Sequence, residues 1–244
     1  MSNLYLDERL DAAAVAPGAT VELTGDEARH AVTVARVRVG ERVAIGDGRG
    51  TIASGAVAST GPRELAIEVD EVVFEEPPAV RLTLVQALAK GDRDELAVQA
   101  ATELGVDRVV PWAAARSVSR WEGQKAQKGR ARWAAIVREA TKQSIRSYLA
   151  EVDEPATTAQ LPARLDGQRM LLLEPTASVR LTDLEPDGRD LALVVGPEGG
   201  IAPAELDRLV AAGAEPVRLG ASVLRTSTAG PAAIAVLSAA LGRW

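Results

Sequence analysis

The sequence predicts an α/β protein, with a small β-rich domain first and a larger domain built on a parallel sheet after it. Two continuous apolar runs, at residues 170–173 and 191–195, are typical of strands that are buried on both faces of a parallel sheet. Short β-branched or alternating runs, separated by turns, dominate residues 1–73. From residue 80 onward, strand patterns alternate with helical ones, which indicates helices on both sides of the sheet.

The composition is that of an ordinary globular protein. The chain has 244 residues, of which 47% are hydrophobic and 25% are charged, and this length and balance suit two domains with buried cores. Cysteine is absent, which excludes disulfides, thiolate metal ligands and a cysteine nucleophile. Because His30 is the single histidine, a multi-histidine metal site is excluded and a Ser-His-Asp triad is disfavoured. We therefore expect no metal site.

No feature of the sequence indicates a membrane protein. No apolar run approaches the roughly 18 residues that a membrane-spanning helix needs. Residues 1–11 are acidic and lack the basic and then apolar pattern of a signal peptide. We expect a cytoplasmic protein that has no membrane partner.

Residues 1–73 are expected to form a small β-barrel with one helix. The turn Gly46-Asp47-Gly48-Arg49-Gly50 separates two strand runs, and glycine tolerates the positive φ angles of a tight hairpin. Residues 26–37 space their alanine and valine side chains for one helical face. An acidic, proline-bearing segment marks the end of this domain, so residues 74–79 are taken as a linker. The expected strands are residues 20–23, 42–45, 51–58 and 65–69.

Residues 80–244 form the second expected domain. Asp92 is placed to cap a helix over residues 92–104, with Glu95 three residues later as in a capping box. Pro203 suits the first turn of a later helix that Gly213 terminates. The other expected helices are residues 131–146 and 226–241, and the expected strands are residues 80–87, 109–110, 170–173, 191–195 and 217–219.

A basic segment interrupts an acidic chain. The net charge of the chain is −6, whereas residues 116–146 hold nine basic and two acidic side chains. Such a block indicates a site for a polyanion. A solvated, arginine-rich helix is the simpler alternative. The basic residues are Arg116, Arg120, Lys125, Lys128, Arg130, Arg132, Arg138, Lys142 and Arg146.

Three loops follow expected strands at the carboxyl edge of the predicted sheet, which is where open α/β sheets bind ligands. They are Leu172-Leu173-Glu174-Pro175, Gly196-Pro197-Glu198-Gly199-Gly200, and residues 219–225, which lead into the last helix. Glycines in the second loop allow the backbone to approach a ligand closely, although the loop matches neither a P-loop nor Gly-x-Gly-x-x-Gly. Taken alone, each loop is equally consistent with a tight turn, and Arg225 with a surface side chain. Thr226 or Ser227 is placed to cap the last helix.

A fourth group lies on the expected helix over residues 131–146. Spacings of three and four residues place Glu139, Lys142, Gln143 and Arg146 on one flank of that helix. They form either a functional cluster or a set of surface pairs worth only a few tenths of a kcal/mol.

The order of these motifs resembles the bacterial 16S ribosomal RNA uridine-N3 methyltransferase family, of the SPOUT class of trefoil-knot methyltransferases. The resemblance rests on Gly-Pro-Glu-Gly-Gly after a buried strand and on Leu-Arg-Thr-x-Thr-Ala at residues 224–229. The chain departs from the family at Ser227, where a glutamate is usual, and at Ala221-Ser222, where Pro-Arg is usual; this puts any role of that glutamate in doubt. Further matching segments are Lys90-Gly91-Asp92, residues 101–106, Arg116-Ser117-Val118, Glu139-Ala140…Gln143-Ser144…Arg146, His30…Arg36…Gly40 and residues 47–50.

The resemblance implies a PUA-like RNA-binding β-barrel at residues 1–73 and a knotted SPOUT-type domain at residues 80–244. It implies that the protein is a homodimer that uses S-adenosylmethionine to methylate N3 of a uridine in 16S ribosomal RNA, either free or in an assembled small subunit. The residues expected to bind the cofactor are Leu173, Glu174, Pro175, Gly196, Pro197, Gly199, Gly200, Ile201, Leu219, Gly220, Leu224 and Thr226.

The implied reaction requires removal of the N3 proton of uridine. N3–H of uridine is a poor nucleophile until its proton leaves, so a base or a cation that stabilises the uracil anion is required. Arg225 is expected to stabilise the anion, and Glu139 and Glu198 are the candidate bases. Two alternatives are a SPOUT enzyme for another RNA position, such as a transfer-RNA ribose 2′-hydroxyl, and an inactive RNA-binding protein of ribosome assembly. The expected RNA contacts are Arg36, Arg38, Arg49, Lys90, Arg116, Lys142, Gln143 and Arg146.

Overall fold

The computed structural model describes residues 3–244 and divides the chain into two compact units. One unit is Met1–Pro77 together with Thr141–Leu149, and the other is Pro78–Ala140 together with Ala150–Trp244. The first cut, between Pro77 and Pro78, falls within the linker expected at residues 74–79.

The segment Thr141–Leu149 corrects the expected division, because it packs with the first unit although it follows residue 80 in the chain. Tyr148 pairs with Arg49 in an isolated antiparallel bridge, and the Gly50 N–H donates to the Ser147 carbonyl at 3.1 Å. These contacts join positions almost a hundred residues apart. A boundary drawn from local composition therefore does not reveal them.

The first unit is built on a five-stranded sheet of order β1-β3-β4-β5-β2. Strands β1 and β3 are parallel, and the other pairs are antiparallel. The expected glycine-rich hairpin joins β3 to β4, and its Gly48 and Gly50 have φ angles of 69° and 113°. The strands are β1 (Asn3–Leu6), β2 (Thr20–Thr24), β3 (Arg42–Gly46), β4 (Thr51–Gly61) and β5 (Glu64–Phe74).

A glycine fixes how the two longest strands of this unit pair. The register of β4 and β5 shifts at Ser54/Gly55. A Cβ at Gly55 would lie 2.0 Å from the Glu68 carbonyl oxygen, so only glycine fits there. Helix α1 (Gly25–Arg29) continues as the π-helix η1 (His30–Val34), and the two replace the single helix expected at residues 26–37.

The second unit contains a seven-stranded sheet of order β12-β10-β11-β6-β7-β8, with β9 beside β7. Every pair in it is parallel, as the apolar runs predict. Strand β11 has the expected bounds, and all five of its residues are buried. The strands are β6 (Leu82–Ala87), β7 (Arg108–Ala113), β8 (Glu151–Val152), β9 (Ala156–Thr157), β10 (Arg169–Leu173), β11 (Leu191–Val195) and β12 (Glu215–Val217).

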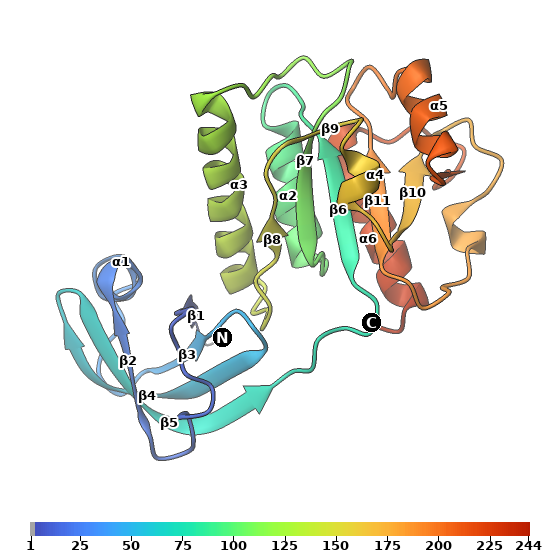
Figure 1. Ribbon diagram of the computed structural model, residues 1–244. Coiled ribbons are helices and arrows are strands. Elements are labelled where there is room, and N and C mark those ends of the chain that lie inside the picture. The colour runs from blue at the N-terminus through green and yellow to red at the C-terminus, as the bar shows by residue number, and fades with distance from the viewer. Residues whose placement is uncertain (1–2) are drawn as a thin grey trace. The chain divides into compact units, whose positions relative to one another are not determined.

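Helices cover both faces of this sheet (Figure 1). Val85 and Val194 pack on one face with Leu161 and Leu209, which come from α4 and α5. Leu84 points to the opposite face, where α2 and α6 pack against each other and α6 contacts β6 and β11. The helices are α2 (Arg93–Glu103), α3 (Gln124–Gln143), α4 (Leu161–Arg164), α5 (Pro203–Ala211) and α6 (Thr226–Ala240), with a 3-10 turn η2 (Leu181–Asp183).

The start of α2 differs from the expected capping box. Asp92 has a φ angle of 59° and makes no side-chain cap bond. Instead Asp94 accepts hydrogen bonds from the N–H groups of Ala89, at 3.0 Å, and Glu95, at 2.9 Å. The half-buried Glu95 does not bond back to the start of the helix and forms an ion pair with the exposed Arg132. In residues 3–244 no helix combines the length and hydrophobicity needed to cross a bilayer.

Candidate functional site

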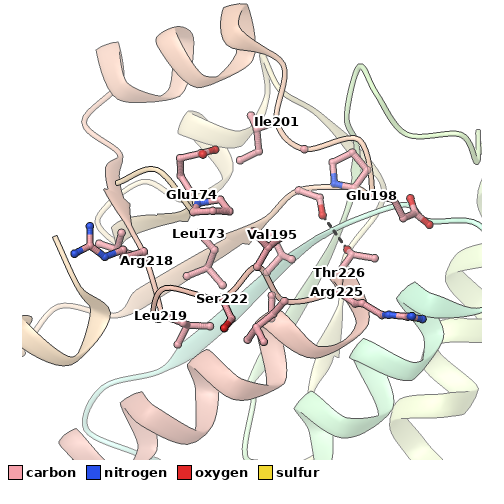
Figure 2. Close-up of a pocket in the computed structure, with 18 of the residues that line it drawn as sticks. Leu173, Glu174, Val195, Glu198, Ile201, Arg218, Leu219, Ser222, Arg225 and Thr226 are labelled. Carbon is pink, nitrogen blue, oxygen red and sulfur yellow. Dashed lines mark hydrogen bonds between the residues drawn. The ribbon is translucent and has the colours of Figure 1, made fainter. Parts of the chain in front are cut away.

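The three expected loops meet at the carboxyl ends of β10, β11 and β12 and enclose a cavity of about 410 Å³. Figure 2 shows their side chains around it. Such a volume is in the range of small-molecule sites. Of the residues expected to bind the cofactor, those that line the cavity are Leu173, Glu174, Pro175, Gly196, Pro197, Gly200, Ile201, Leu219, Gly220, Leu224 and Thr226.

A buried hydrogen-bond chain ties the start of α6 to the second loop and to strand β6. The Thr226 hydroxyl donates to the Gly196 carbonyl at 2.8 Å and accepts from Gln86 Nε2 at 2.9 Å. Thr226 therefore ties the start of α6 to β11 and β6; it does not cap its own helix, whose N-cap position is Arg225. Gln86 is fully buried and was missed by sequence reasoning, because a lone glutamine in a strand gives no signal of its contacts.

The glycines of the second loop have different tasks. Gly200 has a φ angle of 72°, which favours glycine. A Cβ at Gly196 would lie 2.8 Å from Ile201 Cγ1, so the loop can fold back only on a glycine. Gly199, an expected cofactor residue, does not line the cavity; its Cα faces Arg116, and its carbonyl accepts from the Arg116 guanidinium at 3.0 Å.

Glu198 lines the cavity, but its carboxylate is already engaged. Its Oε1 accepts hydrogen bonds from the Lys90 N–H, at 3.0 Å, and from Arg93 Nη1, at 3.1 Å. Burial raises the pKa of the Glu198 carboxyl, but hydrogen bonds from its own N–H and that of Lys90, together with Arg93, outweigh burial and lower the pKa below its usual value. A carboxylate in this state is a weak proton acceptor.

Three arginines line the cavity: Arg93, Arg218 and Arg225. The Arg218 guanidinium donates to the Ala177 carbonyl and supports the first loop. Arg225 is exposed, as expected for a group that faces a ligand. Arg93 and Arg218 were missed: Arg93 is the first residue of a helix, and Arg218 follows a three-residue edge strand, so neither carries a motif. Arg93 is identified by its hydrogen bond to Glu198, which lies more than a hundred residues away in the chain.

The remaining expected residues lie outside the cavity lining. Glu139 is exposed on α3 and does not line the cavity. Arg36 and Arg38 are exposed in the first unit, where Arg36 has a φ angle of 57°. Arg49 has a structural contact, since its Nη1 donates to the Glu8 carbonyl at 2.9 Å.

The basic block is largely used in contacts within the protein. Arg120 donates to the carbonyls of Ala114 and Ala115, and Arg132 forms a two-bond ion pair with Glu95. Lys142 pairs with Glu27 at 3.1 Å within the first unit. Only part of the local charge excess is therefore available to a polyanion. Gln143 is exposed, and Ile145, between Gln143 and Arg146, is 45% exposed with a φ angle of 55°.

Family comparisons agree with this architecture. Residues 75–238, more than half of the chain, match the model of the RNA methyltransferase domain, and residues 23–70 match the RNA methyltransferase PUA domain. The chain belongs to the RNA methyltransferase family. The fold class expected from the sequence, a PUA-like β-domain followed by a SPOUT-type α/β domain, is confirmed.

Named relatives within this family share most of the chain. Ribosomal RNA small subunit methyltransferase E of Mycobacterium bovis is 42% identical over 233 residues, which are 93% of this chain and 89% of that protein. The protein of the same name from Bacillus subtilis is 32% identical over 230 residues, 90% of each chain. The crystal structure of the Neisseria gonorrhoeae protein of that name, solved with bound S-adenosylmethionine, superposes with a TM-score of 0.87 at 26% identity, covering 98% of both chains.

Proposed function

We propose that this chain is an S-adenosylmethionine-dependent methyltransferase that modifies ribosomal RNA of the small subunit, at N3 of a uridine. The observation that carries the proposal is the cavity where the three loops meet, in a chain 42% identical to a ribosomal RNA small subunit methyltransferase E. The Neisseria gonorrhoeae relative was crystallised with S-adenosylmethionine, which supports this cofactor as the ligand of the cavity.

The cavity suits a nucleoside-sized cofactor. Apolar side chains of Leu173, Val195 and Leu219 line it, together with glycine backbone at Gly196 and Gly220. No atom lies within 4 Å of the position that a Cβ at Gly220 would take, so the wall is open there. Adenine would rest against this apolar wall, and Glu174 would serve the ribose hydroxyls. When bound, the cofactor supplies an electrophilic methyl group on a sulfonium.

The protein's own task in the proposed chemistry is to favour the uracil anion. Arg225 is placed to stabilise charge that appears on the uracil oxygens as the N3 proton leaves. The contacts of Glu198 and its lowered pKa make it a weak candidate for the base. Glu139 does not line the cavity. We therefore assign the proton to water at the cavity mouth.

The first unit is proposed to bind RNA. The match of residues 23–70 to an RNA methyltransferase PUA domain supports this role for the barrel expected at residues 1–73. Arginines there would contact phosphates and position the substrate. Exposed Arg36 and Arg38 are the candidates, whereas Arg49 is used within the unit.

We also propose a homodimer. Val223 is 75% exposed and Leu224 38% exposed beside the cavity, and α6 carries many alanines that allow close packing. Light scattering across micromolar concentrations is expected to give twice the chain mass. A monomer throughout that range would contradict the proposal.

The deciding experiment maps modified nucleotides in ribosomal RNA from a deletion strain and from the same strain carrying the gene. We expect one 3-methyluridine in 16S RNA to disappear and return. Purified protein with labelled cofactor should then methylate small subunits, or free 16S RNA, from the deletion strain. Cofactor binding with a different missing modification would point to another RNA position, and no cofactor binding would point to an RNA-binding protein of ribosome assembly.

A further inference from the structure

Charged side chains line the cavity in two places. Glu174 and Arg218 lie beside the apolar side chains of Leu173 and Leu219, and Arg93, Glu198 and Arg225 form a second charged group. Figure 2 shows Glu198 and Arg225 extending toward the same end, away from Leu173 and Leu219. With adenine against Leu173 and Leu219, as proposed, the second charged group would be left for the reacting end of the cofactor and for the substrate.

Arg93 is held in place by a single group. It is the first residue of α2, and its Nη1 donates to Glu198 Oε1 at 3.1 Å. Within residues 3–244 this carboxylate is its one hydrogen-bonded partner. The side chain is 44% exposed, and a guanidinium carries five N–H donors, so most of them remain available to a ligand.

Other arginine–carboxylate pairs of the second unit are different. Arg132 with Glu95 and Arg189 with Asp187 are surface pairs that do not line the cavity. Surface pairs of this kind contribute little to stability. The Arg93–Glu198 pair lines the cavity instead, and the Lys90 N–H bond to the same oxygen fixes the carboxylate from a second side. The Arg93 guanidinium is therefore tied to a carboxylate that the backbone also holds.

We infer that Arg93 is a catalytic residue, which binds an anionic oxygen of the RNA substrate at the cavity mouth, and that Glu198 is the residue that positions it. The inference rests on the proposed function. The oxygen belongs either to a phosphate beside the target nucleotide or to the uracil ring as its proton leaves. In both cases the donor is aimed before the substrate arrives, which is how fixed cations stabilise charge in an active site. The lowered pKa of Glu198 keeps that carboxylate ionised and able to orient the guanidinium.

The test compares Arg93→Ala, Glu198→Gln and the double variant with Arg189→Ala, a matched loss of an ion-paired arginine outside the cavity. Small subunits from the deletion strain serve as substrate. Calorimetry gives the cofactor Kd, filter binding at several salt concentrations gives the RNA Kd, and single-turnover methylation gives the rate. We expect Arg93→Ala to lower kcat/KM for RNA by about 10²-fold with the cofactor Kd unchanged, and Arg189→Ala to match wild type.

The affected step distinguishes the two oxygens. A weaker RNA Kd with a flatter salt dependence identifies a phosphate, whereas a slower single turnover at saturating RNA identifies the uracil ring. Glu198→Gln should lose less than Arg93→Ala and should add nothing in the Arg93→Ala background, because it acts through Arg93.

Two results would overturn the inference. A cofactor Kd that rises as much as methylation falls would assign Arg93 to the cofactor, and additive losses in the double variant would mean that Glu198 does not act through Arg93. Failure of the proposed function is recognised separately, because wild-type protein would then leave the subunits unmethylated in the same assay.

Discussion

At the scale of single residues, the cavity depends on side chains that hold its loops as much as on those that face it. The chain from Gln86 through Thr226 to Gly196 joins three segments. Arg116 and the Lys90 N–H hold the glycine turn by its Gly199 carbonyl and its Glu198 carboxylate. The sequence predicted the loops, since glycine turns after apolar runs are local signals. It could not predict these supports, because each joins residues that are far apart in the chain.

Gly220 tests the cavity wall. It lines the cavity, and a Cβ there would meet no atom within 4 Å, so Gly220→Val leaves the fold intact and fills space that a ligand needs. We expect cofactor affinity to fall at least about tenfold, or about 1.4 kcal/mol, with an unchanged Tm. Gly199→Ala is the control, since its new methyl faces Arg116 and not the cavity. Calorimetry and thermal unfolding measure both effects, and equal affinities would remove Gly220 from the site.

Ile145 tests a backbone cost. It is β-branched and 45% exposed, yet it has a φ angle of 55° just after α3, where glycine is the usual residue. Ile145→Gly is expected to raise the free energy of unfolding by about 1 kcal/mol, or Tm by about 2–4 °C. Ile145→Ala keeps the Cβ and should change stability little. A drop in Tm for the glycine variant would show that packing of the isoleucine outweighs the strain.

At the scale of elements, the strands buried on both faces were the most predictable. Leu191–Val195 is apolar throughout because sheet neighbours and helices surround it, so its bounds could be read from composition. Two-residue strands such as Glu151–Val152 have no periodicity and were missed. The predicted cap of α2 was wrong, because Asp94 and not Asp92 accepts a hydrogen bond from the loop before the helix. Both residues are aspartates with the same preference for a cap position, so only the backbone geometry decides which of them makes the bond.

The β4–β5 pairing of the first unit depends on Gly55. A Cβ there would lie 2.0 Å from the Glu68 carbonyl oxygen, and backbone cannot move aside as a flexible side chain can. We expect Gly55→Ala to lower the free energy of unfolding by about 3 kcal/mol or more. Gly61→Ala, in the same strand but with no atom closer than 3.5 Å, is the matched control. Denaturant unfolding of both variants measures the difference, and equal midpoints would mean that the strands re-register without cost.

At the scale of the whole molecule, charge is distributed unevenly. The chain is acidic, at −6, but its basic segment and the exposed arginines of the first unit leave local positive groups. Composition predicted a polyanion ligand, and the contacts of Arg120, Arg132 and Lys142 show why the count overstated the free charge. Side-chain partners follow from tertiary structure and could not be counted in the sequence.

Arg36 tests the proposed RNA surface. If it neutralises one phosphate, Arg36→Ala should weaken RNA binding and flatten the slope of log affinity against log salt by about one unit. Cofactor affinity should not change, because Arg36 does not line the cavity. Arg189→Ala removes another exposed arginine, which pairs with Asp187, and should leave the slope as in wild type. Identical slopes for wild type and Arg36→Ala would make Arg36 a solvated surface residue.

The position of Thr226 in the chain has a consequence for biosynthesis. It bonds to Gln86 and Gly196, both of which leave the ribosome earlier, and it stands at the start of α6. A nascent chain can therefore form the hairpins of its first unit while the cofactor cavity is still unfinished. The cavity that is proposed to hold the methyl donor is therefore completed only when the last helix has emerged.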